Sequence, residues 1–191
     1  MKKDFNMIIT GVGGQGLITL ISVIDEAAAI EGHDVRSSEL HGLSQRGGSV
    51  EIHAKFGRKI YSPLIPKGGA DLIFSLEISE ALKGSVFAGL KTQFLVNKHS
   101  MPYLNGLAQD EILKSLAATA KEDNLHLIEA SKLCKEKLQK EVAAGIYLLG
   151  YAVLNGLIPL SEQSVLKAIE NVIPEKYREL NIKAFNLAKH G

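Results

Sequence analysis

The sequence predicts an α/β fold: a Rossmann-like, three-layer and mainly parallel sheet with an antiparallel hairpin and a helical C-terminal third. An apolar run ends at a glycine cluster that is followed at once by a helical pattern, further apolar runs alternate with helical patterns, and the last third of the chain is mostly helical. Strands that alternate with helices are typical of a parallel sheet covered on both faces. At 191 residues the chain is long enough for one such domain, so we expect residues 1–191 to form a single domain.

The first predicted unit is a strand, a tight turn and a helix. The apolar residues 7–10 lead into the glycine cluster at 11–16, and residues 17–31 then place apolar side chains at helical spacing and stop before a glycine. This first glycine motif (residues 11–16) has the spacing of dinucleotide-binding loops, in which glycine lets a phosphate approach the backbone at a helix N-terminus. A close turn without a ligand is the alternative. The candidate binding residues are Gly11, Gly13, Gly14, Gln15 and Gly16.

A second glycine motif (residues 43–50) follows a weak strand over 33–39. It contains Arg46, a cationic fork of donors, flanked by neutral donors and by glycines whose amides can face an anion or a partner's backbone. A solvated loop with an incidental arginine is the alternative. Residues 49–56 alternate apolar and polar side chains like a half-buried strand, and we expect residues 60–61 to form the other arm of a hairpin beside the main sheet. The candidate site residues are Ser44, Gln45, Arg46, Gly47 and Gly48.

The remaining elements continue the alternation. We expect Asp110 and Ser161 to be helix N-caps and Pro174 to lie in the first turn of the last helix. Because residues 142–154 are apolar almost all round, that helix should be buried. The other predicted strands span 70–76, 93–96 and 125–128, and the other helices span 78–82, 111–122, 130–139, 162–172 and 174–187.

Composition excludes several classes of function. A net charge of +1 gives no field for a polyanion, so we expect no nucleic-acid partner. The first apolar run is too short for a secretory signal or a membrane span, which favours a soluble, cytoplasmic protein without a membrane partner. The six histidines lack the spacings of a zinc site, so no metal site is predicted. The single cysteine, Cys134, excludes an internal disulfide and a four-cysteine cluster, and we expect it to pack.

Two common nucleotide-binding modes also fit poorly. The chain has no GxxxxGK[ST] loop, which excludes an ordinary P-loop NTPase. An NAD(P) site needs an acidic residue at the end of the second strand to bind the ribose. Glu39 is the only fair candidate, and the segment before it is too polar for the buried strand of an ordinary dinucleotide domain. We therefore disfavour NAD(P).

The two glycine motifs and the stretch from Ala70 to Glu77, taken together, resemble the gamma-type subunit or domain of 2-oxoacid:ferredoxin oxidoreductases. Within that family, the length of the chain and the sequence of residues 41–48 most resemble the beta subunit of the indolepyruvate-specific enzymes. The resemblance covers essentially the whole chain, although the C-terminal helices match in pattern only. It implies that residues 1–191 are one gamma-type domain of such an enzyme.

The resemblance also implies a reaction and a partner. The complex would oxidatively decarboxylate an arylpyruvate with coenzyme A, using thiamine diphosphate, magnesium and iron–sulfur clusters, and pass electrons to ferredoxin. This chain has one cysteine and no Gly-Asp-Gly segment followed by paired asparagines, so those centres belong on a larger alpha subunit. We therefore expect no catalytic residues on this chain alone, and no activity without the partner.

Coenzyme A, with its diphosphate and additional phosphate, is the ligand that the donors of the two motifs suit best. Contact with the partner, or shaping of the oxoacid cavity, is the rival role for these motifs. Pyruvate, 2-oxoglutarate or branched-chain oxoacids are alternative substrates within the family. A free-standing nucleotide-binding module is the alternative outside it.

Overall fold

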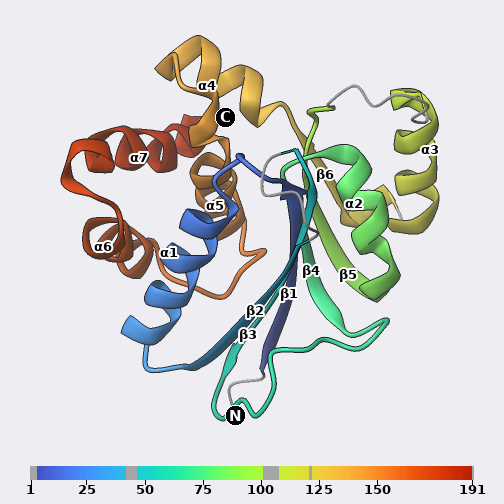
Figure 1. Cartoon of the computed structure of the whole chain (residues 1–191), viewed down its shortest axis with the longest axis horizontal. Helices are drawn as coiled ribbons and strands as arrows, with labels where there is room; N and C mark the ends of the chain where they lie inside the picture. The colour runs from blue at the N-terminus through green and yellow to red at the C-terminus, as the bar shows by residue number, and fades with distance from the viewer. Residues whose placement is uncertain (1–3, 42–46, 101–107, 121, 191) are drawn as a thin grey trace.

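A computed structural model describes residues 4–41, 47–100, 108–120 and 122–190 (Figure 1). The strands are β1 (Phe5–Val12), β2 (Asp34–His41), β3 (Ser49–Gly57), β4 (Ala70–Ser75), β5 (Ala88–Asn97) and β6 (Leu125–Ile128). The helices are α1 (Leu17–Ile30), α2 (Ile78–Gly84), α3 (Gln109–Ala120), α4 (Ala130–Leu138), α5 (Ala144–Leu154), α6 (Glu162–Val172) and α7 (Glu175–Leu187). A short 3₁₀ turn, Glu141–Ala143, precedes α5. Helices α1 and α4–α7 cover one face of the sheet, and α2 and α3 cover the other (Figure 1). The predicted three-layer α/β fold is confirmed.

The sheet is mixed, with the strand order β2-β3-β1-β4-β5-β6. Strand β3 is antiparallel to both of its neighbours, whereas the pairs β1–β4, β4–β5 and β5–β6 are parallel. The antiparallel hairpin is confirmed, but the prediction of its second arm at residues 60–61 was wrong. The partner is β2, and β3 lies inside the sheet rather than beside it. Residues 60–61 do not extend the sheet because Ile60 donates its N–H to the Asp34 carboxylate at 2.8 Å and turns its side chain into the core.

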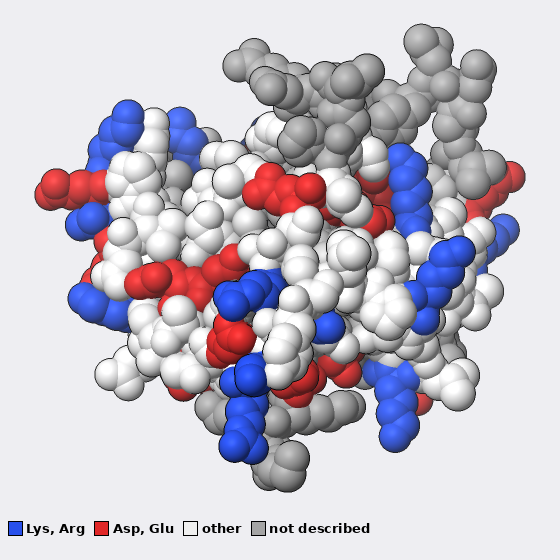
Figure 2. Space-filling view, turned by 60° about the horizontal axis from the view of Figure 1, so that its bottom comes forward, with Lys and Arg blue, Asp and Glu red and all other residues white. Residues whose placement is uncertain are grey.

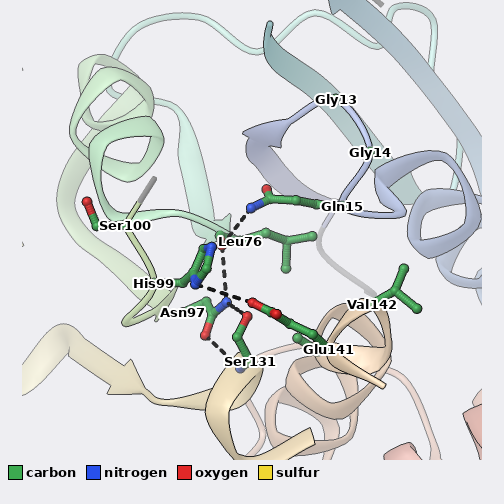
Figure 3. A pocket seen from close by; sticks show the side chains of 11 residues that line it. Gly13, Gly14, Gln15, Leu76, Asn97, His99, Ser100, Ser131, Glu141 and Val142 are labelled. Atoms are coloured by element: carbon green, nitrogen blue, oxygen red, sulfur yellow. Dashed lines mark hydrogen bonds and ion pairs between the residues drawn. The ribbon is translucent and has the colours of Figure 1, made fainter. Parts of the chain in front are cut away.

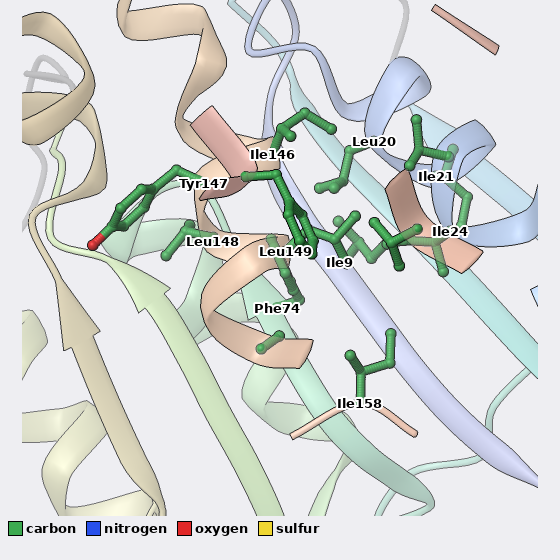
Figure 4. Packing of buried hydrophobic residues seen from close by; sticks show 14 of the residues in the cluster. Ile9, Leu20, Ile21, Ile24, Phe74, Ile146, Tyr147, Leu148, Leu149 and Ile158 are labelled. Carbon is green, nitrogen blue, oxygen red and sulfur yellow. The ribbon is translucent and has the colours of Figure 1, made fainter. Parts of the chain in front are cut away.

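The larger core lies between the sheet and the helices α1 and α5. Ile9 and Phe74 project from β1 and β4 towards Leu20 and Leu149 of these helices (Figure 4). Residues 144–150 of α5 are all buried, which confirms the predicted buried helix. A glycine at position 150 lets α5 approach α7 closely, because a Cβ there would lie 2.5 Å from the Phe185 carbonyl oxygen. The C-terminal helices therefore form one packed layer with α1.

Helix ends follow the predictions in part. Ser161 caps α6 as predicted and accepts a hydrogen bond from the Ser164 N–H at 3.2 Å. Asp110 lies within the first turn of α3, which begins one residue earlier, so its predicted role as N-cap was wrong. Pro174 is the residue before α7 rather than a member of its first turn.

The described surface carries charges of both signs. Lysine and arginine side chains lie among aspartates and glutamates on the face shown in Figure 2, as the net charge of +1 leads one to expect. None of the helices in the described ranges is long and apolar enough to cross a membrane.

Candidate ligand-binding site

The first glycine motif forms the turn between β1 and α1, and its glycines are required for different reasons. Gly14 and Gly16 have φ angles of 106° and 81°, in the left-handed region that disfavours other residues. Gly11 has an ordinary φ but no room, since a Cβ there would lie 2.7 Å from Oε1 of Gln15. Gly16 is also the N-cap of α1 and brings no side-chain acceptor to the first-turn N–H groups. The turn thus exposes a helix N-terminus of the kind that binds anions.

Gln15 fixes the shape of this turn. Its Oε1 accepts a hydrogen bond from the Val12 N–H at 2.8 Å, and its Nε2 lies 3.5 Å from the carbonyl oxygen of Leu76. The side chain therefore joins the end of β1 to the residue that follows β4. We predicted its amide at the mouth of the turn, and it lies there, with its hydrogen-bonding capacity partly used inside the protein.

The two glycine motifs lie side by side. The Gly13 N–H donates to the Gly48 carbonyl at 2.9 Å, and the Gly47 N–H donates to the Gly13 carbonyl at 3.2 Å. These bonds continue the antiparallel pairing of β1 with β3, which ends at Val12 and Ser49. Ser44, Gln45 and Arg46 lie outside the described residues. The two segments that the sequence singled out separately thus meet at Gly13, and of the predicted residues that the structure describes, Gly13, Gly14 and Gln15 line the cavity described next, whereas Gly11, Gly16, Gly47 and Gly48 do not.

A cavity of about 570 Å³ opens beside the first motif, at the carboxyl ends of β1, β4 and β5 (Figure 3). The chain leaves β1 towards α1 on one face and leaves β4 towards α2 on the other. The cavity therefore lies at the switch point of the sheet, where α/β proteins commonly bind ligands. It is lined by Gly13, Gly14, Gln15, Leu76, Asn97, His99, Ser100, Ser131, Glu141, Val142 and Ala144.

The wall opposite the glycine turn is polar and is held by Asn97. Its Nδ2 donates to the Leu76 carbonyl at 3.2 Å and to Oγ of Ser131 at 2.8 Å, and its Oδ1 accepts from the Ser131 N–H at 3.2 Å. Asn97 is only 1% exposed. It therefore anchors the first turn of α4 to the ends of β4 and β5, and acts as a structural part of the wall.

His99 and Glu141 complete this wall. The His99 Nδ1 lies 3.5 Å from Oε1 of Glu141, and the two side chains are 30% and 46% exposed (Figure 3). The cavity thus has the glycine turn and the amide side chain of Gln15 on one side, and a histidine and a carboxylate on the other. Such a set can bind a ligand that carries an anionic group at one end and hydroxyl or amino groups at the other.

Sequence reasoning missed this polar wall. Asn97 directly follows the predicted strand over 93–96 and His99 comes two residues later, and polar residues at the carboxyl ends of parallel strands are a usable signal. Ser131 and Glu141 come from elements whose position beside the cavity depends on the packing of α4 and α5. No local pattern marks them.

Glu39, Cys134 and the potential metal ligands are the remaining residues for which the sequence raised a chemical role. Glu39 lies on β2, and β3 separates β2 from β1, so Glu39 does not occupy the strand next to the glycine turn that the dinucleotide arrangement uses. Cys134 is buried as predicted, and burial raises the pKa of its thiol to about 11. A single protonated, buried thiol does not fit an iron–sulfur cluster, which needs several thiolates. Within the described ranges, no group of three histidine, cysteine or acidic side chains converges to hold a metal ion.

Comparisons with known proteins agree on the fold and on the kind of protein. A family model described as pyruvate ferredoxin/flavodoxin oxidoreductase matches residues 6–190. Indolepyruvate oxidoreductase subunit IorB of Thermococcus kodakarensis is 34% identical over 191 residues, covering 97% of this chain and 94% of the relative. The gamma subunit of a keto/oxoacid ferredoxin oxidoreductase from Geobacter sulfurreducens has a TM-score of 0.69 and 26% identity, with 97% and 96% of the two chains covered.

The same fold also occurs inside a longer chain. The 2-oxoglutarate:ferredoxin oxidoreductase of Magnetococcus marinus, solved with 2-oxoglutarate, coenzyme A and succinyl-CoA bound, matches with a TM-score of 0.74 and 20% identity. The match covers 100% of this chain and 31% of that one. The fold described above therefore exists both as a separate subunit and as a segment of a larger protein.

Proposed function

Because the chain belongs to the pyruvate ferredoxin/flavodoxin oxidoreductase family, we propose that it is the beta, or gamma-type, subunit of a complex that oxidises indolepyruvate and related arylpyruvates. The complex decarboxylates the 2-oxoacid, transfers the acyl group to coenzyme A and passes two electrons to ferredoxin. The relative at 34% identity, which is named for indolepyruvate, supports the substrate class. The shared family supports the reaction type.

The role that we propose for this chain is to bind coenzyme A at the cavity. The observation that carries this proposal is the pairing of the two glycine motifs at Gly13, beside the uncapped N-terminus of α1. Backbone N–H groups and a helix dipole stabilise phosphate oxygens. The cationic Arg46 of the second motif would add a charge-assisted contact to a phosphate. Hydroxyl and amino groups of the ligand would face His99 and Glu141.

The redox and decarboxylation chemistry belongs to a larger partner. Thiamine diphosphate, when bound with magnesium, supplies the carbanion chemistry of decarboxylation, and iron–sulfur clusters carry the electrons to ferredoxin. The residues of this chain do not fit a cluster, which supports placing these cofactors on a large alpha subunit. We propose that the cytoplasmic complex of the two chains is the active form and that this chain alone is inactive.

The test of this proposal is an anaerobic activity assay. This chain is expressed alone and together with its candidate alpha subunit, and reduction of ferredoxin or viologen is followed with coenzyme A and each of four substrates: indolepyruvate, phenylpyruvate, pyruvate and 2-oxoglutarate. We expect activity only in the co-expressed pair, with the aryl substrates preferred. Preference for another oxoacid would keep the reaction and change the substrate. Failure to associate, combined with nucleotide binding by this chain alone, would favour a free-standing binding module.

A single substitution tests the proposed role of the second motif. Arg46→Ala should raise the KM for coenzyme A about ten- to 150-fold, because a charged hydrogen bond contributes about 1.5–3 kcal/mol. Arg58→Ala is the matched control, because it removes the same positive charge from an exposed position. Arg58 follows the last residue of β3, at the end of the strand far from the second glycine motif. Equal KM values for the Arg46→Ala and unmodified complexes, with assembly intact, would exclude a role for Arg46 in binding coenzyme A.

A further inference from the structure

Ser49, the first residue of β3, is hydrogen-bonded to a buried carboxylate on α2, a helix that covers one face of the sheet. Its Oγ donates a hydrogen bond to Oε2 of Glu80 in α2. The second oxygen of this carboxylate accepts from Nζ of Lys83 at 2.6 Å. The second glycine motif is thereby connected to α2 through Ser49, the residue at which β3 begins.

Glu80 is an unusually well-fixed acceptor. Glu80 is only 1% exposed. Burying a carboxylate costs free energy unless its oxygens accept hydrogen bonds or ion pairs. Its backbone N–H donates to the side chain of Glu77, the N-cap of α2, at 3.0 Å. The helix itself packs tightly on β1, because a Cβ at Gly84 would lie 3.0 Å from the Thr10 methyl group. The carboxylate therefore stands at a position that both α2 and β1 define.

The segment from Gly47 to Ser49 is consequently held from two directions. Two backbone hydrogen bonds join Gly47 and Gly48 to Gly13, and the Ser49 hydroxyl joins the next residue to Glu80. Gly13 lines the cavity. Any shift of Ser49 changes the geometry of the bonds to Gly13, because only one residue separates Ser49 from Gly47.

We infer that Glu80 is a positioning residue, which acts through Ser49 to hold Gly47 and Gly48 against Gly13 and so shapes the phosphate-binding end of the cavity. The inference rests on the proposed binding of coenzyme A. Glu80 itself does not line the cavity. Its contribution is to the position of the Gly13 backbone, and so to the shape of the glycine turn that borders the cavity and leads into the N-terminus of α1.

The experiment compares serine variants in the reconstituted complex. Ser49→Ala should raise the KM for coenzyme A about fivefold with kcat within about twofold, because a hydrogen bond to a charged group is lost while the chemistry on the partner is untouched. Ser49→Thr keeps the hydroxyl and should restore the unmodified KM. Ser115→Ala is the matched control, since Ser115 is an exposed serine of α3 whose hydroxyl donates to the Glu111 carbonyl of the same helix.

A second measurement on the isolated full chain does not depend on coenzyme A. Amide hydrogen exchange at Gly47 should be faster in Ser49→Ala than in the unmodified chain, whereas exchange in the interior of α5 should not change. If the unmodified complex saturates with coenzyme A, but Ser49→Ala leaves both the KM and the Gly47 exchange unchanged, the inference is wrong and the proposed function stands. An increase in KM that Ser49→Thr does not reverse also overturns the inference. If the unmodified complex shows no dependence on coenzyme A, the proposed function and the inference fall together.

Discussion

Replacing Gly11 by alanine tests whether the glycine turn is held by Gln15 in the way that the distances indicate. The new Cβ would lie 2.7 Å from Oε1 of Gln15 and 3.2 Å from the two Leu17 methyl groups. Gln15 can swing away, but the Val12 N–H then loses its acceptor at 2.8 Å. Val12 is 1% exposed, so water replaces this bond poorly. An unsatisfied buried donor costs about 1–3 kcal/mol, and we expect Gly11→Ala to lower the free energy of unfolding by that amount.

The same hydrogen bond can be removed in a second way, which makes a double-mutant cycle. Gln15→Ala also leaves the Val12 N–H without its acceptor, so the two substitutions share one cost. Gly11→Ala should therefore destabilise the Gln15→Ala chain less than the unmodified chain, with a coupling energy of about 1–3 kcal/mol.

Guanidinium unfolding followed by far-ultraviolet circular dichroism measures the cycle, because the chain has no tryptophan to serve as a fluorescent probe. Additivity within about 0.5 kcal/mol would refute the reasoning, since the cost of Gly11→Ala would then arise from a contact other than Gln15.

The remaining predictions compare two glycines of α5 and two acidic residues, Asp25 and Glu31. In α5, Gly150→Ala should destabilise by about 1–3 kcal/mol, because its Cβ would meet the Phe185 carbonyl at 2.5 Å. Gly145→Ala should instead stabilise by about 0.5–1 kcal/mol, because its Cβ would be in ordinary contact at 3.6 Å and alanine favours a helix. Equal effects in the same unfolding assay would contradict this account. In α1, burial raises the pKa of Asp25, although the hydrogen bond from Ser37 acts in the opposite direction. The stability that its protonated carboxyl contributes is therefore present below the ordinary pKa and lost as pH rises through the raised pKa. Asp25→Asn should consequently stabilise the protein at neutral pH. Burial opposes ionisation of Glu31, but hydrogen bonds from Ser161 and Ser164, together with His33, lower its pKa. Its contribution is therefore present above the ordinary pKa of 4.5 and lost as pH falls through the lowered value. Melting temperatures measured from about pH 3 to about pH 7 should show Glu31→Gln losing less stability in acid than the unmodified chain, and parallel curves would exclude this role.

Much of the fold could be predicted from local patterns. The strand, glycine turn and helix from residue 5 to residue 30 combine three signals that agree, namely an apolar run, glycines where backbone freedom is needed, and helical periodicity. The position of β3 could not be predicted in the same way. A strand's neighbours are set by contacts distant in sequence, and the polar side chains of β2 concealed its pairing with β3.

The candidate site divides along the same line. The tight turn at the first motif was predictable because φ favours glycine at Gly14 and Gly16, and close packing favours it at Gly11. The pairing of Gly13 with Gly47 and Gly48 was not, because it depends on the placement of β3 between β1 and β2. Asn97 carried a local signal at the end of its strand, whereas Ser131 and Glu141 reach the cavity only through tertiary packing.

The hydrogen bonds between Gly13 and the pair Gly47–Gly48 have a thermodynamic consequence. If the first motif binds a ligand and the second contacts the alpha subunit, both binding events act on one bonded unit and their free energies are linked. Linkage is reciprocal: if docking of the alpha subunit tightens the affinity for coenzyme A by some factor, coenzyme A must tighten the association of the subunits by the same factor. Subunit affinity measured with and without coenzyme A gives the size of this linkage.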